Sequence, residues 1–167
     1  MRDAVKRRGA EPADLVGRYI RLINDALADR PKDMTFAMHL CRGNFKGRWL
    51  SEGGYEAVAE RIFSEIQVDA LFLEYDSPRA GDFAPLRFVS DDKTVVLGLI
   101  TSKSGDLESA DGLRRRIDEA SQHVPLERLA LSPQCGFAST VKGNPVTLDD
   151  EKNKLRLVVE VADAVWG

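Results

Sequence analysis

Four short apolar runs, separated by segments of helical periodicity, constrain the fold of this chain more than any other feature. These candidate strands are residues 34–40, 69–75, 94–101 and 128–132. Runs without an alternating polar face are typical of strands buried on both sides, as in parallel sheets. Apolar residues recur at helical spacing in residues 11–29, 55–66, 111–123 and 148–165. This alternation predicts an α/β fold in which four parallel strands are joined by helices.

The first and the last of these helices carry apolar residues at helical spacing. In the first helix the recurring apolar residues are Leu15, Val16, Tyr19, Ile20, Leu22, Ile23 and Leu27. In the last helix the residues expected to face inward are Leu155, Val158, Val159, Ala162 and Val165. Between the second and third strands, Pro78, Gly81 and Pro85 predict a loop.

Size and charge fit one globular domain and give no sign of a nucleic-acid or membrane role. The 167 residues are 43% hydrophobic and 31% charged, and the net charge is −3 at pH 7. The longest apolar stretch, residues 95–100, is far too short to span a bilayer. The charged start, MRDAVKRRGAEP, does not resemble a secretory signal, and two cysteines make no disulfide framework. We therefore expect a cytoplasmic protein with reduced thiols.

Four polar side chains fall at or just past the ends of predicted strands. His39 and Cys41 are two residues apart at the end of the first strand, so they project to the same side. Glu74 lies near the end of the second strand, and Cys135 follows the fourth. Parallel strands bring their carboxyl ends to one edge, where α/β proteins hold their active sites. An imidazole, two thiolates and a carboxylate suit Zn²⁺ and disfavour magnesium and calcium.

The same residues also have structural interpretations. A buried cysteine is commonly an inert, small apolar residue, and His-x-Cys alone is a weak motif. An unpaired buried carboxylate is costly, so Glu74 is either a ligand or the partner of a buried arginine, Arg42 or Arg79. Asp76, two residues further on, either points into the same site as a substrate contact or forms a salt bridge in the loop.

Five segments of the chain resemble a known family. They are HLCRGNFKG (39–47), LFLEYDSPRAGDFAPL (71–86), VVLGLITSK (95–103), LES (107–109) and LALSPQCGFAS (129–139). In this order they resemble the carboxyl-terminal catalytic domain of cobalamin-independent methionine synthases, and in particular the short single-domain relatives. The resemblance covers nearly the whole chain, from about residue 14 to the end.

The resemblance implies a (β/α)₈ TIM-type barrel with zinc at the carboxyl ends of its strands. The family's ligands fall here on His39, Cys41, Glu74 and Cys135. It also implies a methyltransferase of methionine biosynthesis, in which the zinc-bound thiol of homocysteine takes the methyl group of methyltetrahydrofolate, usually as a polyglutamate. Glu74, as the weakest ligand, is the one we expect the incoming thiol to displace.

The proton donor for the folate leaving group is not predicted. Some members of the family place a histidine near the end of the strand that matches residues 94–101, whereas this sequence has Thr101, Ser102 and Lys103 there. The remaining histidine, His123, lies at a predicted helix end before a proline and is expected on the surface.

The chain is shorter than the family's barrel, which needs eight strands and typically about 250 residues. Its four strands correspond to strands five to eight, so residues 1–167 are expected to form a partial zinc-dependent methyltransferase barrel domain. It is then a fragment of a longer protein, a half-barrel that pairs with a second copy or a separate partner, or a remnant. A lone half-barrel exposes two sheet edges and should associate.

Two alternative functions remain open at this point. The same zinc site can transfer another alkyl group to another thiol, such as coenzyme M, because the zinc handles the thiol and not the donor. Alternatively, the chain binds zinc without turnover.

Overall fold

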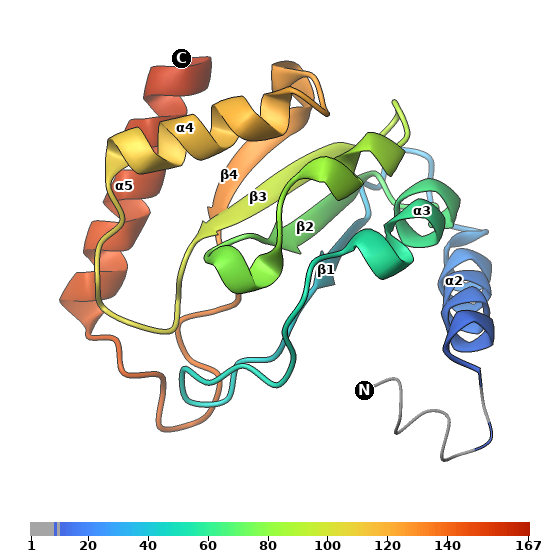
Figure 1. The fold of residues 1–167 in the computed structure, drawn as a ribbon, viewed down its shortest axis with the longest axis horizontal. Helices are drawn as coiled ribbons and strands as arrows, with labels where there is room; N and C mark the ends of the chain where they lie inside the picture. Colours follow the sequence, from blue (N-terminus) through green and yellow to red (C-terminus); the bar gives the residue numbers. More distant parts are fainter. Residues whose placement is uncertain (1–8, 10) are drawn as a thin grey trace.

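Four parallel strands form one sheet in the computed structural model, which describes residue 9 and residues 11–167 (Figure 1). The sheet order is β1-β2-β3-β4, and every neighbouring pair is parallel. The strands are β1 (Ala37–Leu40), β2 (Ala70–Glu74), β3 (Thr94–Ile100) and β4 (Leu129–Pro133). The predicted α/β fold is therefore confirmed. Most of the charged start of the chain, which does not resemble a secretory signal, lies outside the described residues.

Helices alternate with the strands as the periodicity predicts. They are α2 (Pro12–Leu27), α3 (Glu56–Glu65), α4 (Ala110–Ser121) and α5 (Leu148–Trp166). Helix α5 packs on β4 and α4, whereas α2 packs on α3 at the other side of the molecule (Figure 1). No helix among the described residues combines the length and apolarity that a membrane crossing requires.

The connection from β2 to β3 holds more structure than the predicted loop. It contains two short 3₁₀ helices, η1 (Pro78–Ala80) and η2 (Ala84–Phe88). A proline near the start of each fixes the backbone dihedral that helices need. Helix η2 packs on α3 and takes the place of the long helix that follows each other strand.

The strands differ in how well they are covered. In β3, six of the seven residues are buried, as expected for a strand covered on both faces. The first strand departs from this expectation, because Ala37 and His39 are exposed. It also begins later than predicted, since Met34 and Thr35 precede the strand and are exposed. Strand β1 lies at an open edge of the sheet, with no strand on its outer side among the described residues.

The inward face of α5 was predicted correctly only in part: Val158 and Val165 pack partly buried against the core, but two of the other predicted residues do not. Leu155 is 43% exposed and Val159 is 58% exposed, whereas Lys154, Leu157 and Val161 are buried. Lys154 is held on the buried face because its ammonium group bonds the Asp106 carbonyl oxygen and lies 3.0 Å from a carboxylate oxygen of Glu108.

Helix α2 forms as predicted, and its apolar residues differ in burial. Tyr19 and Leu22 are more than half exposed, whereas Ile20 and Leu27 are buried. Both outer helices therefore carry apolar side chains that the described residues leave uncovered.

Candidate metal centre

The ends of three strands deliver the four predicted ligands to one place. His39 lies in β1 and Cys41 just after it, Glu74 is the last residue of β2, and Cys135 follows β4. The register places Gly98 of β3 between Glu74 and Ser132 of β4. A side chain at Gly98 would lie 2.9 Å from the Leu73 carbonyl oxygen, so glycine permits this close approach.

The four donor atoms lie within 4.8 Å of one another. The Cys135 sulfur is 3.2 Å from the Cys41 sulfur, 3.1 Å from Glu74 Oε1 and 3.5 Å from His39 Nε2. The Cys41 sulfur is 3.9 Å from Glu74 Oε1. Zinc bonds of about 2.0–2.3 Å in tetrahedral geometry separate the ligand atoms by roughly 3.3–3.8 Å. Both the donor types and their spacing therefore fit a zinc ion.

The cluster is buried on one side and open on the other. Glu74 is fully buried and Cys135 is partly buried, whereas His39 and Cys41 are exposed. Burial, followed by hydrogen bonds to Cys41 and to Glu74, raises the pKa of the Cys135 thiol. The charges of Glu74 and Cys41 add to this rise for Cys135, and a divalent cation bound among the sulfurs would offset it.

Glu74 is held by Arg42 and Tyr55 through contacts that do not use its Oε1 atom. The Arg42 backbone N–H donates to Glu74 Oε2 at 2.9 Å. The Arg42 guanidinium donates to the Glu74 carbonyl oxygen and to the Tyr55 hydroxyl, each at 2.9 Å. The Glu74 backbone N–H donates to that hydroxyl at 2.8 Å. Burial raises the pKa of Tyr55 to about 12, which keeps the hydroxyl protonated in this network.

Neither arginine that the sequence offered as a partner of the Glu74 carboxylate forms that ion pair. Arg42 binds it through the backbone, and Arg79 pairs with Asp76 at 2.9 Å. Asp76 therefore forms the loop salt bridge that was its structural interpretation. Its role as a substrate contact stays a prediction.

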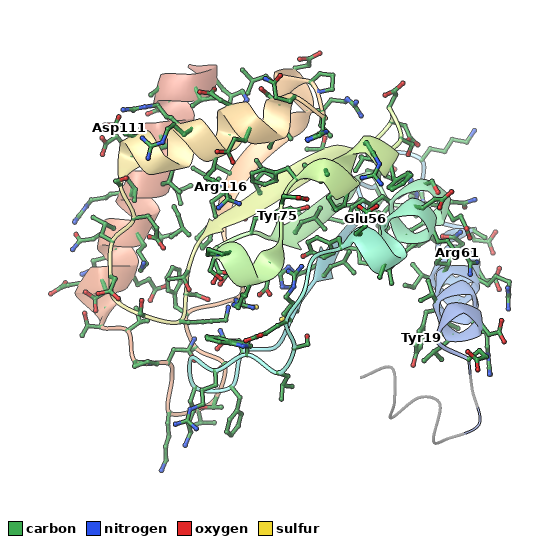
Figure 2. The ribbon with its side chains drawn as sticks, viewed as in Figure 1. Tyr19, Glu56, Arg61, Tyr75, Asp111 and Arg116 are labelled. Atoms are coloured by element: carbon green, nitrogen blue, oxygen red, sulfur yellow. The ribbon has the colours of Figure 1, made fainter. Side chains whose placement is uncertain are left out.

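The next residue after Glu74 faces the opposite way. Tyr75 is fully buried under α4, on the side where Arg116 lies (Figure 2). Its ring packs on Phe83, with ring centroids 4.6 Å apart. This alternation anchors the end of β2 in the core while Glu74 faces the cluster.

Sequence reasoning did not identify Lys103 as a neighbour of the cluster. Its side chain is only 7% exposed, and its ammonium nitrogen lies 3.7 Å from Glu74 Oε1. The signal that could have found it is a lysine three residues past a buried strand, at the same sheet edge as the ligands. His123 is exposed, as expected.

A family model described as "Cobalamin-independent synthase, Catalytic domain" matches residues 20–164. The chain belongs to the cobalamin-independent methionine synthase family. In this family, the uncharacterized protein YxjG of Bacillus subtilis (strain 168) is 55% identical over 159 residues, which are 95% of this chain and 42% of YxjG. The uncharacterized protein YxjH of the same organism is 52% identical over 166 residues, covering 99% of this chain and 44% of YxjH.

Two solved structures of cobalamin-independent methionine synthases are similar to this chain. One, from Listeria monocytogenes and assigned only provisionally as a vitamin-B12-independent methionine synthase, is 39% identical with a TM-score of 0.71. The match covers 95% of this chain and 43% of that one. The B12-independent methionine synthase of Shewanella sp. W3-18-1, in complex with selenomethionine, is 20% identical with a TM-score of 0.73. The match covers 91% of this chain and 44% of that one, and at this identity it supports only the similarity of fold.

The chain spans less than half the length of each of these relatives. What a whole enzyme of this family does therefore depends in part on regions that this chain does not contain.

Proposed function

We propose that this chain is the zinc-binding part of a methyltransferase that forms methionine from homocysteine and methyltetrahydrofolate, the latter as a polyglutamate. In this proposal residues 1–167 supply strands five to eight of the barrel, and the reaction takes place in the cytoplasm. The observation that carries the proposal is the convergence of His39, Cys41, Glu74 and Cys135 within 4.8 Å of one another. Membership of the family supports the reaction class.

Zinc, held by those four residues, would supply a site at which a substrate thiol loses its proton and remains nucleophilic. The two cysteines and Glu74 bring negative charge, which keeps a neighbouring sulfur electron-rich. Arg42 and Tyr55 fix Glu74, so that its Oε1 faces the sulfurs. The exposed side of His39 and Cys41 leaves room for a thiol substrate to approach. In the reaction the sulfur–methyl bond forms as the bond between the methyl carbon and the folate nitrogen breaks.

The second candidate function is the transfer of another alkyl group to a different thiol, such as coenzyme M. The chain spans less than half of its relatives, so the residues that select the donor are in part absent from it. The third candidate is a chain that binds zinc without turnover. It rests on the convergence of the same four donor atoms.

Metal analysis of the purified full chain, with an assay of methionine formation, tests the proposal. We expect about one zinc per chain and its loss in His39→Ala. His123→Ala is the matched control, because it removes an exposed histidine outside the cluster. Wild-type chain without zinc, or equal zinc in both variants, would contradict the metal centre. Zinc without methionine, even when the missing barrel half is supplied, would favour one of the other two candidates.

We also propose that the open sheet edges bind another protein unit. Strands β1 and β4 are the two edges of the sheet, and the outer helices α2 and α5 expose apolar side chains beside them. Unpaired edges with neighbouring apolar surface promote association.

A further inference from the structure

Lys103 is a buried cation beside the candidate metal centre, and the function proposed above gives it no role. Its ammonium nitrogen lies 3.7 Å from Glu74 Oε1, 3.9 Å from Asp76 Oδ2 and 2.6 Å from Gln134 Oε1. The side chains of Lys103, Glu74 and Asp76 are 7%, 0% and 5% exposed, respectively. The Lys103 ammonium group is poorly hydrated, so its stabilisation comes mainly from these three partners. Moving away from them would cost it much of that stabilisation.

The contact between Lys103 and Glu74 involves the oxygen that faces the two cysteines. Glu74 Oε1 is 3.1 Å from the Cys135 sulfur and 3.9 Å from the Cys41 sulfur. The other oxygen, Oε2, accepts the Arg42 backbone N–H and is turned away. A cation bound among the sulfurs would therefore share Oε1 with the ammonium group of Lys103.

Gln134 prevents Lys103 from moving away from this position. It follows β4 and directly precedes Cys135, so the bond from the Lys103 ammonium group to Gln134 Oε1 ties Lys103 to the segment that carries a ligand. The Lys103 backbone N–H also donates to Thr101 Oγ1 at 3.2 Å. The positive charge is thus a fixed part of the site.

We propose that Lys103 is a positioning residue that competes with the bound cation for Glu74 Oε1 and so weakens Glu74 as a metal ligand. This inference rests on the zinc site of the proposed function. Two like charges in a poorly hydrated site repel, so Lys103 lowers the affinity for a divalent cation. A carboxylate shared in this way is the ligand most easily released, which makes Glu74, and not a cysteine or the histidine, the exchangeable member of the set.

Zinc affinity of the full chain, measured by competition with a chromogenic chelator, tests this inference without an activity assay. We expect Lys103→Met to bind zinc at least about tenfold more tightly than wild type, because the repelling charge is removed and Glu74 loses its ion-pair partner. Release of zinc to excess chelator should slow correspondingly. Lys103→Gln is a second neutral variant in case the Met variant does not fold, and Lys103→Arg, which keeps the charge, should restore affinity to near wild type.

Lys46→Met is the matched control, because it removes the same charge from an exposed position in the loop after Cys41. Solvent screens that charge, so the affinity should stay close to wild type. If the neutral Lys103 variants bind zinc as wild type does, or more weakly, Lys103 does not compete for Glu74 and the inference is overturned. A wild-type chain without zinc affinity would overturn the metal centre and this inference together.

Discussion

Cys135 shows how strongly the metal-free site resists ionisation. Its thiol lies against a buried carboxylate and a second thiol, and burial is the largest cause of its raised pKa. The unfolded chain would expose the same thiol to water, with an ordinary pKa of about 8.5. The folded and unfolded states of the metal-free chain therefore differ in proton binding above that pH.

We predict that the metal-free chain loses stability as pH rises past about 8.5. In that range the folded state keeps the Cys135 proton while the unfolded state has released it, so deprotonation favours unfolding. Below that pH both states hold the proton and the contribution is fully present. Denaturant unfolding of chelator-treated protein between about pH 7 and about pH 10 measures the effect.

Two comparisons isolate this effect from other titrating groups. Cys135→Ala should show a smaller fall in stability over the same pH range. The zinc-loaded chain should likewise show a smaller fall in stability, since zinc-bound thiols have already given up their protons. Identical pH dependence in wild type and Cys135→Ala would mean that another group is responsible.

The sequence could predict which four residues of the candidate site converge, but not which residues lie next to them. His39, Cys41, Glu74 and Cys135 were found because each lies at or just past the end of an apolar run, and parallel strands end at one edge. Lys103 was missed because it follows β3, whereas the carboxylate that its side chain reaches, Glu74, belongs to β2. Spacing along one segment carries no information about such contacts.

At the scale of elements, the type of each strand and long helix followed from periodicity, but the face of α5 did not. Its apolar residues are spread widely around the helix, and two stripes were available. The buried stripe includes Lys154, a fully buried lysine that a hydrophobic count places outside. Its contact with Glu108, 46 residues away along the chain, cannot be read from the periodicity of the helix.

We predict that Lys154→Ala lowers the free energy of unfolding by about 3 kcal/mol, the loss expected when one member of a buried ion pair is removed. Glu108 would be left without its cation, and it also accepts the Thr101 backbone N–H at 2.8 Å, just past β3. Denaturant unfolding measures the change. Lys152→Ala, on the exposed side of the same helix and paired with Asp149, should cost less than about 1 kcal/mol. Equal losses in the two variants would contradict this role of Lys154.

At the scale of the whole molecule, the two edges of the sheet are flanked differently from the centre. Helix α5 follows β4 and packs on it, whereas helix α2 precedes β1 and packs on α3 (Figure 1). A closed barrel places one helix on the outside for each strand. Two copies of this chain would bring α5 of one and α2 of the other to the same junction. The complementary unit is instead expected to have four strands with helices only between them.

We therefore predict that the chain alone associates without a defined stoichiometry, and that the part of YxjG outside its matched 159 residues converts it to a defined one-to-one complex. Self-association and binding of the YxjG segment have the same cause. The sheet edges and the exposed Leu155 and Val159 lack partners among the described residues. Co-expression followed by light scattering on a sizing column measures the mass of each species. Val159→Glu should prevent the complex, whereas Gln122→Glu, at the exposed end of α4, should not. A stable dimer of this chain that ignores the YxjG segment would show that a second copy, and not a complementary unit, covers these edges.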